Sequence, residues 1–143
     1  MPPRVDFYLS DVAGVEARVR LACRIAEKAY LANQSVVVLC GDPALLPKVD
    51  DLLWTFGEGT FVPHDTVTVP GSACEAPVAL TTGALPEGHT DVLINLGESV
   101  PPCFEKFTRV AEFLDARPEV RAAGRERFKL YRGKSIEPQT HNV

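Results

Sequence analysis

The sequence has 143 residues, 45% of them hydrophobic and 24% charged, which is the size of one compact domain with enough apolar side chains for a core. Four residues precede the first apolar run and no stretch of 18 apolar residues occurs, so we expect no signal peptide, no membrane span and a cytoplasmic location. The net charge of −4 argues against a general polyanion-binding protein, although the charge is unevenly distributed along the chain.

A strand–helix–strand unit is predicted at the start of the chain. The apolar run from Val5 to Leu9 predicts a buried strand. Apolar residues spaced three and four apart between Val15 and Asn33 then predict a helix with one buried face. The continuous, mostly β-branched run at 36–40 is typical of a central parallel strand that is covered on both faces.

The middle of the chain predicts one more helix and several further elements. The helix passes through Val49 and Leu53, with Pro47 tolerated only in its first turn. Residues 57–77 are rich in Gly, Pro, Thr and Ser, which predicts a loop with one edge strand at most. The remaining elements before residue 117 are strands at 77–81 and 91–96, a short helix at 104–107 and a strand at 110–114.

The last helix is expected from about Pro118 to Arg132, because proline is tolerated in a first turn and Gly133 can end a helix. Strands that alternate with helices predict an α/β fold of three layers, with a mostly parallel sheet of about five strands. We therefore expect a single α/β domain over residues 1–134, followed by a flexible C-terminal tail at 135–143.

An α/β fold suggests nucleotide binding, but the sequence lacks the two common phosphate-binding signatures. Residues 41–48 have the wrong spacing for a phosphate loop and include two prolines, which lack the amide hydrogen that such a loop uses. Residues 10–14 stand where a glycine-rich dinucleotide motif would follow the first strand. These absences favour a binding protein without a cofactor. A small α/β enzyme or nucleotide-binding protein without a recognisable phosphate loop is the alternative.

Cysteine and histidine side chains give little support for catalysis or metal binding. The four cysteines form no CxxC pair, so no zinc site is predicted, and their scatter favours a reducing compartment. Cys23 and Cys40 lie in apolar segments, where a small buried residue is the usual role, although two disulfides stay formally open. A catalytic pair of His64 with Cys103 or with Ser99 also stays open.

Basic residues gather near the C-terminus. Residues 117–134 contain seven basic and two acidic side chains, a net charge of +5, so the remainder of the chain carries −9. On a helical wheel of about 100° per residue, one stripe holds Arg121, Arg125, Phe128, Lys129 and Arg132. Such a stripe suits an acidic peptide with an apolar end. A solvated basic helix face is the alternative, and the acidic remainder of the chain disfavours direct binding of single-stranded DNA.

A second group of aromatic residues surrounds the glycine-rich turn after the second helix. Trp54 and Phe56 precede this turn and Phe61 follows it. A single tryptophan at a helix end is most often part of the core. An exposed protein-binding patch is the other interpretation, and the pattern leaves both open.

These two groups of residues belong to a longer pattern that resembles the chi subunit of bacterial DNA polymerase III. The resemblance covers most of the chain, and its most specific parts are LLW at 52–54 with FVPH at 61–64, and RERFKLYR at 125–132. It implies a Rossmann-like fold and a non-catalytic accessory subunit of the clamp loader, which bridges the holoenzyme to single-stranded DNA-binding protein.

The resemblance also implies which residues bind the acidic, Phe-terminated tail of single-stranded DNA-binding protein. Arg121, Arg125 and Lys129 would meet the carboxylates of the tail, while Phe128 and Leu114 would hold its terminal aromatic residue. Phe128 stands where a tyrosine is usual in the family, so the resemblance predicts no hydroxyl hydrogen bond there.

A second partner surface is implied by the same resemblance. Trp54 and Phe61 fall at positions that would anchor the psi subunit of the clamp loader or, alternatively, an iron–sulfur helicase. The resemblance implies no metal site, no catalytic residue, no sequence-specific contact with nucleic acid and no contact with a membrane.

Overall fold

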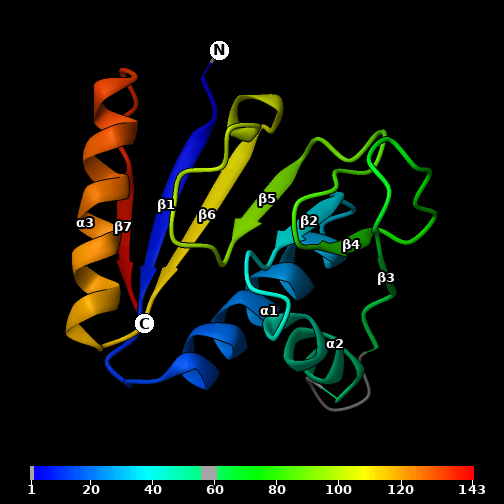
Figure 1. Ribbon diagram of the computed structural model, residues 1–143, viewed down its shortest axis with the longest axis horizontal. Coiled ribbons are helices and arrows are strands. Elements are labelled where there is room, and N and C mark those ends of the chain that lie inside the picture. The colour runs from blue at the N-terminus through cyan, green and yellow to red at the C-terminus, as the bar shows by residue number, and fades with distance from the viewer. Residues whose placement is uncertain (1, 56–60) are drawn as a thin grey trace.

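The computed structural model describes residues 2–55 and 61–143 (Figure 1). The described residues form one sheet of seven strands in the order β3-β4-β2-β5-β6-β1-β7, and all neighbouring strands are parallel. In chain order the elements are β1 (Arg4–Leu9), α1 (Val15–Leu31), β2 (Val36–Leu39), α2 (Leu45–Thr55), β3 (His64–Thr66), β4 (Val78–Thr81), β5 (Val92–Asn95), η1 (Phe104–Lys106), β6 (Arg109–Leu114), α3 (Pro118–Gly133) and β7 (Gln139–Asn142).

The apolar runs form the strands that they predict. β1, β2, β4, β5 and β6 all begin and end within one residue of their expected bounds. The three predicted α-helices are also present, and the predicted short helix at 104–107 is the 3-10 helix η1. Pro47 lies in the first turn of α2, where its missing amide hydrogen removes no intrahelical bond. The α/β class and the parallel sheet are therefore confirmed.

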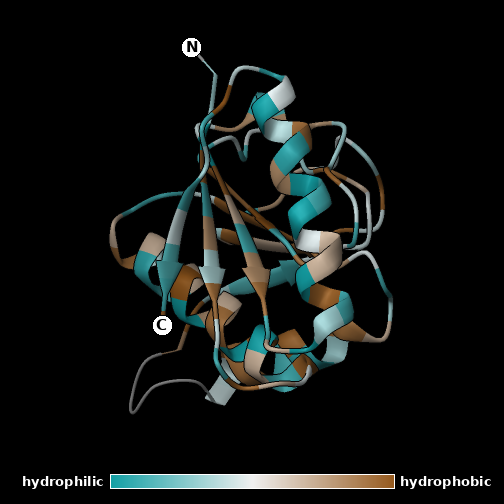
Figure 2. Ribbon diagram, turned by 90° about the vertical axis from the view of Figure 1, so that its left-hand side faces the viewer, coloured by the Kyte–Doolittle hydropathy of each residue, from teal (hydrophilic) through white to brown (hydrophobic). Residues whose placement is uncertain are grey.

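Helices cover both faces of the sheet, so the fold has three layers. α1 and α2 pack on the face toward which Val36 and Val38 point, and α3 packs on the opposite face together with Val37. Figure 2, seen from the side of α3 and β7, shows helical layers on both sides of the strands. A strand covered in this way buries every successive residue, which explains why β2 lacks alternation of apolar and polar residues.

The sheet has seven strands rather than the expected five, and the two additional strands form its edges. β3 consists of His64, Asp65 and Thr66, and β7 of the sequence QTHN, so neither contains an apolar side chain. β3 pairs through its backbone with β4, and β7 pairs in the same way with β1. Hydrophobic patterning marks strands that bury side chains, and it therefore gives no signal for these edge strands.

The segment 135–143, expected as a flexible tail, belongs to the sheet through β7. His141 Nε2 lies 2.8 Å from Oδ1 of the buried Asp6, and the His141 ring stacks on Tyr8 with 4.8 Å between the ring centroids. Ile136, which leads into β7, is buried beside α3. Asp6 and Tyr8 are more than a hundred residues away from His141 in sequence, so local composition does not reveal that this segment packs on the sheet.

Candidate functional site

The cationic helix α3 lies close to the sheet because it has a glycine at the contact. Gly124 is buried and faces Leu114 of β6. A Cβ atom at position 124 would lie 2.5 Å from both δ-carbons of Leu114, far inside an ordinary contact distance. Glycine therefore lets the helix approach β6, and it places the predicted site residue Leu114 directly beneath the helix.

A buried polar network fixes the rotation of α3 about its axis. The carboxylate of Glu112 accepts hydrogen bonds from Arg127 Nε at 2.9 Å, from Asn95 Nδ2 at 2.9 Å and from the Tyr131 hydroxyl at 2.7 Å. Burial raises the pKa of Tyr131, so its hydroxyl keeps the proton that it donates. Because Arg127 and Tyr131 point into the protein, the stripe around Arg125 faces outward.

The structure gives the predicted cations of α3 different surroundings. Arg121 is half-buried and donates to two backbone carbonyls, Asp115 O at 2.8 Å and Ser10 O at 2.9 Å. Arg125 is exposed and makes no side-chain hydrogen bond or ion pair with the described residues. Lys129 is also exposed, and its one ion pair, with Glu126 at 3.4 Å, joins two side chains that are each 72% exposed. Arg125 and Lys129 are thus the cations most available to a ligand.

The apolar part of the predicted site lies at the border between core and solvent. Phe128 is half-buried and packs on the core, with its ring centroid 5.4 Å from that of Phe7. Leu114 is 5% exposed beneath Gly124. The structure therefore brings Arg125, Phe128 and Lys129 together on the outer face of α3, with Leu114 contributing only from below.

Trp54 and Phe61 form an exposed aromatic pair, which excludes the interpretation of Trp54 as a core residue. Their ring centroids lie 4.4 Å apart, and the residues are 61% and 44% exposed. Trp54 comes from the end of α2 and Phe61 from the segment before β3, so the fold brings together two aromatic residues from different parts of the structure. Phe56, the third aromatic residue of this group in the sequence, lies outside the described residues.

His64 supports this aromatic pair, a role that the sequence reasoning missed. Its ring lies edge-on to Trp54, with 5.8 Å between centroids, and 5.9 Å from Phe61. Nδ1 lies 2.7 Å from Val62 O and Nε2 lies 2.6 Å from Asp50 Oδ1. Both partners accept hydrogen bonds, so the two bonds form together when both ring nitrogens carry hydrogen. The signal in the sequence was the FVPH motif itself, which places the histidine next to Phe61.

The considered catalytic pairs of His64 find no support in the geometry. The His64 side chain is 3% exposed, and both of its ring nitrogens are engaged with Val62 and Asp50. Cys103 and Ser99 instead line a cleft at the opposite end of α1 and α2 from this cluster, and His64 is not among the residues that line it. The ring therefore acts as a packed support for the aromatic pair.

Two further features are lacking in the part of the chain that the structure describes. Among residues 2–55 and 61–143, no three His, Cys, Asp or Glu side chains come together in a group that could hold a metal ion. None of the helices within these ranges combines the length and the apolar character needed to cross a membrane.

Comparison with known proteins identifies the family of the chain. Residues 1–139 match the model of the family described as DNA polymerase III chi subunit, HolC. The chain belongs to the DNA polymerase III chi subunit family. Proteins named DNA polymerase III subunit chi are similar to it over most of their length: that of Pseudomonas aeruginosa is 39% identical over 140 residues (98% of this chain, 96% of that protein), and that of Escherichia coli is 31% identical over 134 residues (88% of each). The protein of that name from Haemophilus influenzae is 27% identical over 146 residues, covering 100% of this chain and 99% of the relative.

Membership of the chi subunit family confirms the resemblance inferred from the LLW, FVPH and RERFKLYR motifs. It gives the chain a role in DNA replication as a non-catalytic component of DNA polymerase III. The family does not by itself say which residues contact which partner.

Proposed function

We propose that the protein is an adaptor that links the clamp loader of DNA polymerase III to single-stranded DNA-binding protein by binding the acidic C-terminal tail of that protein along α3. The observation that supports this most is the exposed group of Arg125, Phe128 and Lys129, in which two cations flank a half-buried aromatic ring. Carboxylates of the tail would take charge-assisted hydrogen bonds from the cations. The terminal aromatic residue of the tail would pack against Phe128, above Leu114.

The charge distribution favours a short acidic peptide over DNA. Residues 117–134 carry a net charge of +5, and the remainder of the chain carries −9. A long polyanion such as DNA would extend past α3 and be repelled by this acidic remainder. Arg121 contributes as a support in this proposal. Its bonds to Asp115 O and Ser10 O tie α3 to the ends of β6 and β1, and in this proposal its charge also attracts the carboxylates of the tail.

A labelled tail peptide tests the assignment by fluorescence anisotropy. The double variant Arg125→Ala, Lys129→Ala loses two exposed charge pairs, each worth about 0.5–1 kcal/mol, so binding weakens about fivefold to thirtyfold. The matched control is Arg24→Ala, Lys28→Ala on α1, where the same residue types have the same four-residue spacing and are also exposed. The control keeps its affinity within about twofold, allowing only for long-range charge effects. Equal weakening in both variants would refute a specific site on α3.

For the second partner, we propose that Trp54 and Phe61 dock either the psi subunit or an iron–sulfur helicase. Large aromatic side chains that are exposed and stacked on each other are typical anchors of protein interfaces. Together with His64 they form an aromatic cluster at the end of α2, whereas the peptide site lies on α3 across the sheet. One molecule could therefore hold both partners at once, in the cytoplasm where the bacterial chromosome is replicated.

Capture of each purified partner tests this second surface. Trp54→Ala removes the larger anchor and weakens partner binding about thirtyfold, the size of a hot-spot loss of about 2 kcal/mol. Leu31→Ala is the matched control, because Leu31 is 63% exposed, similar to Trp54, but lies at the end of α1. The tail peptide should bind the Trp54→Ala variant with unchanged affinity. Retention of both partners by this variant would contradict the assignment.

A further inference from the structure

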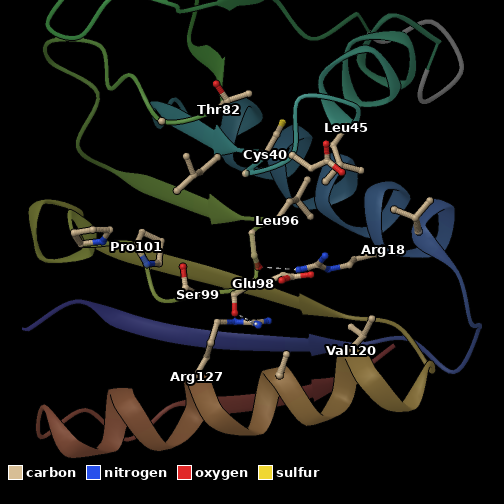
Figure 3. Close-up of a pocket in the computed structure, with 18 of the residues that line it drawn as sticks. Arg18, Cys40, Leu45, Thr82, Leu96, Glu98, Ser99, Pro101, Val120 and Arg127 are labelled. Carbon is tan, nitrogen blue, oxygen red and sulfur yellow. Dashed lines mark hydrogen bonds between the residues drawn. The ribbon is translucent and has the colours of Figure 1, made fainter.

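A cleft of about 920 Å³ opens at the carboxyl ends of the central strands β2 and β5 (Figure 3). These strands are neighbours, but the chain leaves them toward opposite faces: β2 leads to α2 on one face and β5 leads to η1 on the other. In open parallel sheets, a crevice of this kind forms where the connections diverge, and it is the usual place for a ligand. The volume is that of a pocket for a small molecule.

The floor of the cleft is bare backbone because glycines occupy both strand ends. Gly41 has φ +74°, and a Cβ atom there would lie 2.9 Å from the Cα of Gly97. A side chain at position 41 would therefore meet the backbone of the loop after β5 in addition to straining its own backbone. The two turns can lie this close together only without side chains, which leaves their main chain open to an occupant.

Arg18 contributes a buried positive charge to the wall of this cleft. Its side chain comes from the first turns of α1 and is 7% exposed. Nε donates to Phe113 O at 2.7 Å and Nη2 to Gly97 O at 3.2 Å, while Nη1 has no hydrogen-bond partner among residues 2–55 and 61–143. No carboxylate of these residues forms an ion pair with it. Its direct partners are carbonyl groups, and the carboxylates of Glu112 and Asp115 act on it only from beyond ion-pair distance. This arrangement is unusual, since buried charges are generally paired.

Arg127 adds a second buried guanidinium on the opposite wall. It is 2% exposed, and Nη1 donates to Glu98 O at 2.9 Å, while Nη2 is buried without a hydrogen-bond partner in the described part of the chain. Figure 3 shows Arg18 from α1 and Arg127 from α3 reaching the segment around Glu98 from opposite sides. Burial, followed by the charge of Arg127, lowers the pKa of Arg18, which indicates that the two cations are close enough to repel each other.

The inner cleft therefore has more positive charge than its carboxylates balance. Glu112 pairs with Arg127, and no carboxylate pairs with Arg18. The buried Asp115 pairs with Arg117. The acidic side chains that line the cleft, Asp42, Glu98 and Glu119, are exposed, so water screens them. A buried cation is screened much less, so the inner end of the cleft favours an anion.

We propose that this cleft binds a small ligand through an anionic phosphate or carboxylate group, which lies between Arg18 and Arg127. Such a group would accept a hydrogen bond from Arg18 Nη1 and offset the charge of Arg18, while the buried charge of Arg127 would attract it from the opposite wall. The remaining volume would hold the body of the ligand against Leu39, Leu45 and Leu96. This site is separate from the outer face of α3 and from the pair of Trp54 and Phe61, so the proposal stands independently of the partner assignments.

Titration of the full chain with two probes, followed by ¹H–¹⁵N NMR, tests the proposal. Inorganic pyrophosphate and citrate are compared at constant ionic strength, and the amide signals of Gly41 and Gly97 report on the floor of the cleft. Ala123→Glu introduces a carboxylate into the cleft wall, and Ala122→Glu adds the same group to the neighbouring exposed position of α3. We expect saturable shifts in the wild type and in Ala122→Glu, with binding at least tenfold weaker in Ala123→Glu.

The two probes distinguish the sources of the anionic group. Saturation by pyrophosphate assigns a phosphate-bearing ligand, and saturation by citrate alone assigns a carboxylate ligand; either supports the site. The proposal is overturned when neither probe moves the two glycine signals, or when Ala123→Glu binds as tightly as the wild type. Shifts confined to Arg125 and its neighbours would likewise overturn it. Arg18→Gln is a second variant that we expect to lose binding of the probe, and it does not depend on position 123. Circular dichroism checks that this variant folds.

Discussion

Replacing Gly124 by alanine should destabilise the protein, although alanine is the better helix former. The added Cβ atom would lie 2.5 Å from both δ-carbons of Leu114, whereas carbon atoms in contact lie about 3.5–4.0 Å apart. Either the helix or the leucine must therefore move by about 1 Å. Overpacking of this kind costs about 1–3 kcal/mol, and the gain in helix propensity offsets about 1 kcal/mol. The expected net loss is about 1 kcal/mol, or about 3–5 °C in Tm.

Urea unfolding followed by circular dichroism measures this loss, and Gly133→Ala is the matched control. Gly133 ends the same helix, but no heavy atom lies within 4 Å of a Cβ atom placed there. Alanine at 133 should leave stability unchanged or raise it by up to about 1 kcal/mol. A Gly124→Ala protein as stable as the Gly133→Ala protein would refute the argument that glycine is needed for the approach of α3 to β6.

Three further predictions concern the network, the C-terminal strand and the aromatic pair. Glu112→Gln leaves the Arg127 guanidinium buried without a counter-charge, and urea unfolding should show a loss of about 3–5 kcal/mol; a loss below about 1 kcal/mol would contradict it. Burial raises the pKa of Asp6, but hydrogen bonds from His141 and an arginine outweigh this and hold the pKa below 3.8. The carboxylate thus stabilises the fold above that pH, and this part of the stability is lost as the pH falls through the folded-state pKa, so Asp6→Asn should flatten acid unfolding curves. His64→Ala should weaken binding of the second partner about fivefold, with tail-peptide affinity unchanged, because a contact between aromatic rings is worth about 1 kcal/mol.

The central part of the fold could be predicted because its strands are buried on both faces. A run such as VVVL in β2, apolar at every position and mostly β-branched, is typical of a strand in the middle of a covered sheet. The edge strands β3 and β7 could not be predicted in this way, since HDT and QTHN contain no apolar residue. Backbone pairing with β4 and β1 stabilises them, and any sequence without proline can form such pairs.

The stripe on α3 follows from the sequence alone, because helical periodicity fixes which side chains share a face once a helix exists. Arg125, Phe128 and Lys129 share a face for this reason, whatever the helix packs against. The exposure of Trp54 beside Phe61, and the bonds of Arg121 to two carbonyls, depend on the tertiary structure. Burial and hydrogen bonding depend on residues distant in sequence, and pattern alone does not specify those partners.

The charge of the chain illustrates the same division. Sequence arithmetic located a net charge of +5 near the C-terminus, and it treated Arg127 as one more cation of that segment. In the fold, Arg127 points inward and pairs with Glu112. Arg127 and Arg18, which come from opposite ends of the chain, both donate to carbonyls of the loop after β5. Helix geometry decides which cations face outward, but only the packing of α1 and α3 on opposite sides of one sheet edge brings two buried cations to the same cleft.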